Sequence, residues 1–391
     1  MRPSDFIAKK VRDIPPSGIR KFFDIASEMK DAISLGVGEP DFVTPWNIRE
    51  AAIYSIEKGE THYTSNSGKQ ELRELAAEYF YGRFGLDYTP AQILVTMGAS
   101  EAIDMACRTV LEPGEEVLLP EPSYVAYSPS VALAGGVAVG IETKAEDCFK
   151  LKPEAIEAAV TEKTKALVLT YPNNPTGAIM TREDLMALVP VIEKHNLLVL
   201  SDEIYAELTY GEKHTSIASL PGMKDRTILI HGFSKAFAMT GWRLGLVAAH
   251  PELLQEMLKI HQYSALCAPV MSQAAGIEAL RAGLADGFES VENMKRQYNR
   301  RRRLLVKELN RMGLSCFEPL GAFYVFPCIQ STGLSSEDFC HKLLMEKKVA
   351  AVPGGAFGRC GEGFIRCSYA ASMENIEEAL KRIEAFIQER R

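Results

Sequence analysis

Lys235 is a candidate amine nucleophile. It follows an apolar, β-branched run at residues 227–230 and a short link that ends in Ser234. Most lysines lie in water, and burial beyond such a strand would lower the pKa of the amine by up to about 3–5 units. A neutral amine can attack a carbonyl carbon, so this residue could form an imine. The alternative is a lysine whose stem is buried while its ammonium group reaches solvent.

Two other apolar runs are also followed by polar side chains. The run 197–200 leads into Asp202 and then Tyr205, and the run 166–170 leads into Asn174, which lies between two prolines. A buried carboxylate is costly unless it meets a positive partner, which is either a ligand or a structural salt bridge. The prolines form a rigid turn, or they hold the asparagine amide over a ligand, because stiff loops place donors accurately.

A glycine turn offers a site for an anion. Gly98, Ala99 and Ser100 follow the run 93–97 and precede a predicted helix. Free amide N–H groups and the positive end of the helix dipole suit a phosphate, although such a turn can also be a plain helix cap. Ser234 and Arg243 are two further candidate phosphate ligands.

Together these side chains match one cofactor. Pyridoxal phosphate requires a lysine for a Schiff base, an acid that keeps its ring nitrogen protonated, and a nest for its phosphate. Lys235, Asp202 and the turn at Gly98 can supply these three functions, each at the end of a predicted strand. The combination is more specific than its parts and predicts a pyridoxal 5'-phosphate site.

The elements that must position these residues alternate along the chain. Short β-branched runs are separated by segments of helical periodicity, such as 71–83 and 182–194. The alternation predicts an α/β fold with a mostly parallel sheet sandwiched by helices. Ligands of such sheets bind beyond the carboxyl ends of the strands. The predicted strands are 93–97, 116–119, 137–141, 166–170, 197–200, 227–230 and 244–248.

The pattern changes after about residue 251. Long helices are predicted there, with one short strand, and they indicate a smaller α+β domain that the N-terminal segment joins. We therefore expect a large cofactor-binding domain at 46–285 and a small domain, with an N-terminal arm, formed by 1–45 and 286–391. The predicted elements are helices 273–282, 291–311, 336–347 and 373–389 and strand 322–326.

Composition excludes several classes of protein. The 391 residues are 47% hydrophobic and 24% charged with net charge −7, so we expect neither a membrane span nor nonspecific nucleic-acid binding. The basic run 300–303 is a solvated helix face or a local contact with an anion. The eight cysteines occur singly, no signal peptide is evident, and the seven histidines lack metal-ligand spacing. We expect reduced thiols, a cytoplasmic location and no metal.

The sequence resembles the class I/II (fold type I) pyridoxal-phosphate-dependent aminotransferases along nearly its whole length. The resemblance rests on motifs at both ends of the chain and at the strand ends. These are Ser34-Leu35-Gly36-Val37-Gly38-Glu39-Pro40-Asp41-Phe42, Asn173-Asn174-Pro175-Thr176-Gly177, Ser201-Asp202-Glu203-Ile204-Tyr205, Ser234-Lys235, Gly241-Trp242-Arg243 and Gly363-Phe364-Ile365-Arg366. The resemblance implies a transfer of amino groups between an L-amino acid and a 2-oxo acid by a ping-pong mechanism.

The resemblance assigns catalytic roles to three residues. Lys235 would hold the cofactor as an internal aldimine and then move the proton between the substrate α-carbon and the cofactor. Asp202 would pair with the pyridinium nitrogen and keep the ring cationic. Tyr205, with Asn174, would hydrogen-bond the phenolic oxygen of the ring.

The remaining cofactor contacts follow in the same way. Tyr124 would stack on the pyridine ring, its alternative being ordinary core packing. The phosphate would be bound by the turn Gly98-Ala99-Ser100, by Ser234 and by Arg243. Tyr63 matches a tyrosine that family members extend into the neighbouring subunit's site, which implies a homodimer.

For the substrate, the resemblance indicates Arg366, Gly38 and Asn174. Arg366 would bind the α-carboxylate in a bidentate fork, and Gly38 would lie in the loop that covers the substrate. Some members that take acidic side chains carry a basic residue where this chain has Ser100. Arg20 either supplies that charge or is a plain surface arginine, so the donor remains open among aspartate, alanine, aromatic and N-acetyl-diaminopimelate types.

Two other classes of function are compatible with the same fold. Carbon–sulfur lyases and decarboxylases on the same fold share every cofactor contact with aminotransferases and differ in how the reaction ends. Some transcription factors also carry this fold behind a basic DNA-binding domain. Because signals for the fold begin by about Ile33, we expect no room for such a domain here.

Overall fold

The computed structural model describes residues 2–15, 29 and 31–390. A seven-stranded sheet lies at its centre, in the order β2-β8-β7-β6-β5-β3-β4. All neighbours are parallel except β8, which runs antiparallel to both β2 and β7. The strands are β2 (Ile93–Thr96), β3 (Glu116–Glu121), β4 (Val137–Glu142), β5 (Thr164–Leu169), β6 (Leu198–Asp202), β7 (Thr227–Gly232) and β8 (Gly245–Ala248). The predicted mostly parallel sheet of seven strands is confirmed.

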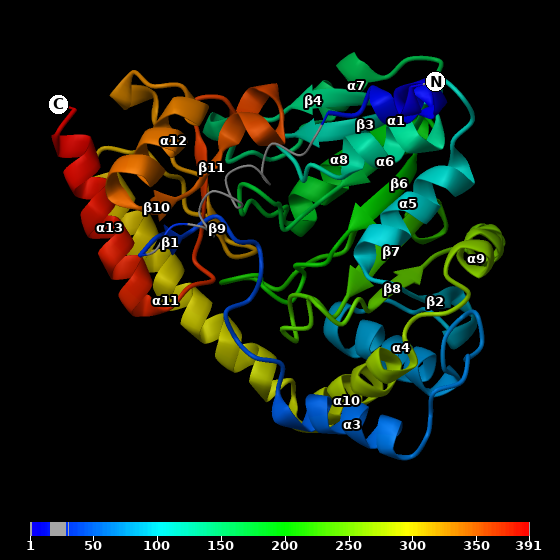
Figure 1. Ribbon diagram of the computed structural model, residues 1–391. Helices are drawn as coiled ribbons and strands as arrows, with labels where there is room; N and C mark the ends of the chain where they lie inside the picture. The colour runs from blue at the N-terminus through cyan, green and yellow to red at the C-terminus, as the bar shows by residue number, and fades with distance from the viewer. Residues whose placement is uncertain (1, 16–28, 30, 391) are drawn as a thin grey trace.

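Helices cover both faces of this sheet (Figure 1). Alternate residues of β3 point to opposite faces of the sheet and enter different cores. Val117 and Leu119 pack with α5, α6 and α9, whereas Leu118 packs with α7 and α8. Near β2 and β8, helices α3, α4 and α10 form a third core. The bounds are α1 (Lys9–Arg12), α3 (Trp46–Glu57), α4 (Gln70–Phe84), α5 (Ala99–Val110), α6 (Tyr127–Ala134), α7 (Pro153–Ala159), α8 (Arg182–Lys194), α9 (Pro251–Ser264) and α10 (Val270–Asp286).

A second group of elements, here called the C-terminal unit, packs beside the carboxyl ends of the strands (Figure 1). Its small sheets pair β1 with β10 in parallel, and β12 antiparallel with both β11 and β9. Its core is rich in buried aromatic side chains. The elements are β1 (Ile33–Ser34), β9 (Tyr324–Val325), β10 (Val349–Ala350), β11 (Val352–Pro353), β12 (Ile365–Ser368), α11 (Glu289–Arg311), α12 (Ser336–Lys347) and α13 (Met373–Gln388).

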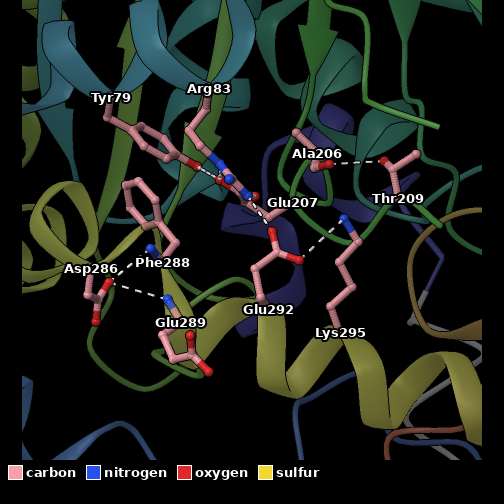
Figure 2. Close-up of polar contacts among 10 residues, drawn as sticks. All are labelled: Tyr79, Arg83, Ala206, Glu207, Thr209, Asp286, Phe288, Glu289, Glu292 and Lys295. Carbon is pink, nitrogen blue, oxygen red and sulfur yellow. Dashed lines mark hydrogen bonds and ion pairs between the residues drawn. The ribbon is translucent and has the colours of Figure 1, made fainter. Parts of the chain in front are cut away.

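Helix α11 links the two groups of elements. Its N-terminal end is attached to α4, because Arg83 donates both to Glu207 and, at 2.8 Å, to Glu292 (Figure 2). Tyr79 also donates to Glu207, at 2.9 Å. From this end the helix runs past the seven-stranded sheet to α13 (Figure 1).

The basic run 300–303 lies on α11, and the solvated-face interpretation is wrong for half of it. Arg301 and Arg302 are 7% and 4% exposed, and each pairs with a carboxylate, Asp41 or Glu318. Arg300 and Arg303 are exposed. The local-contact alternative therefore describes the two buried arginines, whose partners lie far away in the sequence or on the following loop.

Helix packing gives opposite expectations for two glycines inside helices. A Cβ on Gly283 of α10 would overlap the ring of Phe288, whereas a Cβ on Gly82 of α4 would meet nothing within 4 Å. We expect Gly283→Ala to lower the free energy of unfolding by about 1–3 kcal/mol through overpacking. Gly82→Ala should raise it by about 0.5–1 kcal/mol, because alanine loses less backbone entropy in a helix. Urea unfolding of both variants measures the difference, and two shifts of the same sign would contradict it.

Candidate functional site

A cavity of about 600 Å³ lies at the carboxyl ends of the central strands, against the C-terminal unit. Most of the residues proposed from sequence line it. They are Gly38, Ala99, Ser100, Tyr124, Asn174, Asp202, Tyr205, Ser234, Lys235, Arg243 and Arg366. Of the other two candidates, Gly98 lies beside the cavity against Arg243, and Tyr63 does not line it.

Lys235 stands in the link between β7 and β8. Its Nζ donates to the main-chain oxygen of Gly38 at 2.7 Å. Burial, opposed by the charge of Glu39 and helped by the positive charges of Arg366 and Arg243, lowers the pKa of this amine to about 8. A substantial fraction of the amine is therefore uncharged near neutral pH, as a nucleophile or base requires.

Asp202 ends β6 and is 5% exposed. Its carboxylate accepts from the Tyr127 hydroxyl at 2.8 Å and from the Ile204 amide at 3.2 Å. Burial raises the pKa of Asp202 to about 6, although these two hydrogen bonds favour the charged form. Within the described residues Asp202 has no ion-pair partner, so a cation in the cavity would find a carboxylate ready to pair with it.

Arg366 lies on β12 and is 3% exposed. Its Nη1 donates to Asn174 at 2.8 Å and its Nη2 to the oxygen of Gly36 at 2.6 Å, while its buried Nε has no hydrogen-bond partner in the part of the chain that the structure describes. The guanidinium also stacks 4.5 Å from the ring centre of Tyr324. A guanidinium held in a fixed position in the lining of a cavity is suited to bind a carboxylate.

The opposite end of the cavity is suited to an anion. Gly98 caps α5 with φ 79°, and a Cβ there would come within 2.6 Å of Nη2 of Arg243. Glycine adopts this left-handed φ without strain and leaves room for the guanidinium beside the start of the helix. Ser234 is buried nearby in the same lining. Main-chain amides, a hydroxyl and a guanidinium together form a phosphate-binding set.

Sequence reasoning missed several residues of this cavity. Tyr324 lines it, shares a 2.8 Å hydrogen bond with Tyr205, and would be met by a side chain on Gly38. Tyr127 holds Asp202, and Glu39 accepts from Thr240 at the rim. Two of these are tyrosines in a strand and a helix, where an aromatic residue is indistinguishable by pattern from core.

The cavity does not test two of the predictions from sequence. Tyr63 is 82% exposed. Arg20 lies outside the described residues, so its proposed contact with substrate has no structural counterpart here. The described residues include no group of three or more His, Cys, Asp or Glu that could hold a metal. No helix in the described ranges has the length and apolarity needed to cross a membrane.

Comparison with known proteins places these features in a family. The family model described as "Aminotransferase class I and II" matches residues 30–383. An aspartate aminotransferase of Pyrococcus abyssi is 47% identical over 97% of both chains. Aromatic-amino-acid aminotransferase 2 of Thermococcus litoralis is 46% identical over 98% of this chain and 99% of its own. The solved aspartate aminotransferase of Thermus thermophilus with maleate superposes with a TM-score of 0.93, at 37% identity over 98% of this chain and 100% of its own.

The pKa of Lys235 gives a prediction that can be tested without activity. In ligand-free protein, acetylation of Lys235 by acetic anhydride should rise with pH around a midpoint of about 8, because only the neutral amine reacts. Glu39→Gln removes a charge that favours the ammonium form and should move the midpoint to lower pH. Mass spectrometry of the peptide that carries residue 235 measures both curves. Glu57→Gln, on the exposed side of α3, is the control, and an unshifted midpoint in Glu39→Gln would contradict the expectation.

Proposed function

Since this chain belongs to the aminotransferase class I and II family, we propose that the cavity around Lys235 is where it moves an amino group from an L-amino acid to a 2-oxo acid. The chain is an aminotransferase, and this family depends on pyridoxal phosphate. One observation carries the proposal: three groups meet at one cavity. They are the partly neutral amine of Lys235, the buried carboxylate of Asp202, which has no ion-pair partner among the described residues, and the anion-binding turn that precedes α5.

The residues present fit pyridoxal 5'-phosphate. Asp202 is a buried carboxylate without a cationic partner among the described residues, and the protonated ring nitrogen would supply one. The turn at Gly98, with Ser234 and Arg243, would bind the phosphate, and Lys235 would form the imine. Tyr205 and Asn174 would hydrogen-bond the phenolic oxygen, and Tyr124 would stack on the ring. When bound, the cofactor supplies an electron sink for the charge left when the α-proton departs.

Lys235 and Arg366 would act on the substrate itself. With a pKa lowered to about 8, the Nζ of Lys235 can take the α-proton as a base and return it as an acid. Arg366 would turn its Nη1 and Nη2 from Asn174 and Gly36 toward the two oxygens of the substrate carboxylate. A two-point grip of this kind fixes the orientation of the bond that breaks.

We extend the proposal to the organisation of the chain. The division into a large domain at 46–285 and a small domain formed by 1–45 and 286–391 is supported by the aromatic-rich core of the C-terminal unit, to which the large domain contributes Tyr205, Leu208 and Tyr210. The cavity lies between the two, so substrate binding would draw the small domain inward. A cytoplasmic location remains our expectation.

The test of the function is a half-reaction. Wild-type protein with pyridoxal phosphate and an L-amino acid, without any 2-oxo acid, should convert the cofactor to its pyridoxamine form and release the corresponding 2-oxo acid. Aspartate and phenylalanine are the first donors to try, because relatives are named for both classes. Lys235→Ala should give neither product and no borohydride-fixed adduct at this residue.

Lys213→Ala is the control, because this lysine is exposed and does not line the cavity. It should match wild type, and circular dichroism should show that both variants fold. Release of ammonia together with pyruvate from a donor with a carbon–sulfur bond at its β-carbon, such as cystathionine, would instead support a lyase, and release of the donor's own amine with carbon dioxide a decarboxylase. Either result would contradict the proposed function.

Tyr63 provides the test of the proposed homodimer. Its ring is 82% exposed in the single chain, which suits a residue that reaches the phosphate in a neighbouring subunit. We expect Tyr63→Phe to leave the sedimentation behaviour of the dimer unchanged and to weaken cofactor binding roughly tenfold, through one lost hydrogen bond to a charged group. Tyr81→Phe, at an exposed position on α4, should change neither. A monomer in sedimentation, or equal cofactor affinity in both variants, would contradict the prediction.

A further inference from the structure

The loop 36–42, here called the covering loop, makes direct contact with the two proposed cationic groups of the site. The oxygen of Gly36 accepts from Arg366 at 2.6 Å, and the oxygen of Gly38 accepts from Lys235 at 2.7 Å. Glu39 accepts from the Thr240 hydroxyl at 3.0 Å. The position of this loop therefore determines the surroundings of the amine and of the guanidinium together.

The far end of the covering loop is attached to α11 by one arginine. Nη1 of Arg301 donates to Oδ1 of Asp41 at 2.8 Å. The guanidinium also lies over the rings of Phe42 and Tyr298, at 5.3 and 5.6 Å from their centres. Arg301 is 7% exposed, so the guanidinium of this charge-assisted bond is shielded from water, whereas Asp41 remains in contact with solvent.

The same arginine reaches the segment that carries Arg366. Its Nη1 lies 3.5 Å from the oxygen of Tyr369, three residues beyond Arg366 and just after the end of β12. The guanidinium of Arg301 thus contacts the covering loop, which accepts a hydrogen bond from Arg366. It also contacts the segment that directly follows Arg366 in the chain.

The helix that carries Arg301 is itself anchored elsewhere. Glu292, near the N-terminal end of α11, pairs with Arg83, and Arg83 pairs with Glu207 of the segment that follows Tyr205 (Figure 2). Lys295 lies 4.0 Å from Glu292 on the same helix. Because these contacts do not involve the covering loop, α11 is a support whose place does not depend on that loop.

From this geometry we propose that Arg301 is a positioning residue for substrate binding, which acts by holding Asp41 and so the covering loop over the cavity. The proposal rests on the proposed aminotransferase function. When a substrate carboxylate replaces the Gly36 oxygen at Arg366, the covering loop loses that hydrogen bond but stays attached to α11 through Asp41 and Arg301. Without that attachment the loop has more conformations to lose on binding, and substrate affinity falls while the cofactor contacts are unchanged.

The next residue provides a matched control. Arg302 is also buried. It donates to the carboxylate of Glu318 at 2.9 Å and to the main-chain oxygen of Pro319 at 3.0 Å. It also stacks 5.3 Å from a tyrosine ring, that of Tyr210. Unlike Arg301, it also donates twice to Oδ1 of Asn299 on its own helix, at 3.1 and 2.9 Å. None of these partners belongs to the covering loop, which is the difference that the comparison uses.

The experiment compares Asp41→Asn with Glu318→Gln in the holoenzyme. In Asp41→Asn we expect KM for the amino donor to rise roughly tenfold, while kcat stays within about twofold of wild type. This pattern is expected because the lost interaction stabilises the bound substrate and the transition state equally. The absorption spectrum and the cofactor dissociation constant should not change. Glu318→Gln should leave KM, kcat and spectrum as in wild type.

Equal KM values in the two variants, or a lower kcat with unchanged KM in Asp41→Asn, would overturn the proposal. If Asp41→Asn does not fold, Arg301→Lys against Arg302→Lys makes the same comparison, because lysine keeps the charge but cannot stack and pair as the planar group does. The wild-type half-reaction distinguishes a failure of the aminotransferase function from a failure of the role of Arg301. Failure of that reaction refutes the aminotransferase function. Success of that reaction with an unchanged KM in Asp41→Asn, or in Arg301→Lys where that variant replaces it, refutes only the role of Arg301.

Discussion

The desolvation of one carboxylate is the constraint on which the rest of the site depends. Asp202 ends a buried strand, and burial raises its pKa to about 6 even though Tyr127 and Ile204 donate to it. A group in this state is stabilised by any cation that enters the cavity. The nearby amine of Lys235 is buried as well, and its pKa falls toward neutrality. The same loss of water thus prepares an acid to hold a positive ring and an amine to act as a base.

The arginines show how the fold distributes positive charge around these two groups. Arg243 lies against the turn that precedes α5, Arg366 crosses the cavity to Asn174 and Gly36, and Arg301 holds the covering loop from outside. Each is supported by neutral acceptors, aromatic rings or a single carboxylate, and these partners fix its direction. Arg243 and Arg366 therefore approach a ligand from defined sides, while α11 joins α10 to β9 and α13 of the C-terminal unit.

Much of the fold was accessible from local pattern. Helices α8 and α12 have the predicted bounds 182–194 and 336–347, because Thr181 and Ser335 are N-cap residues whose side chains accept from the amides three residues on. Helix α3 was not predicted. Its residues Trp46, Ile53, Tyr54 and Ile56 are exposed in the single chain, so the helix has apolar side chains on more than one face and shows no clear period. Strand 322–326 is shortened to Tyr324–Val325, because only these residues pair with β12.

The sequence by itself determined the strands and the polar residues that follow them, since alternation, turn residues and β-branched runs are local properties of the chain. It therefore placed Asn174, Asp202 and Lys235 at one edge of a sheet. Only the tertiary structure decided which distant groups meet them. The burial of Arg301, 260 residues from Asp41, and the contact of Tyr324 with Tyr205, 119 residues away, depend on how the C-terminal unit packs. A charged or aromatic side chain has the same local pattern whether its partner is water, core or a functional group, and that choice is made by packing.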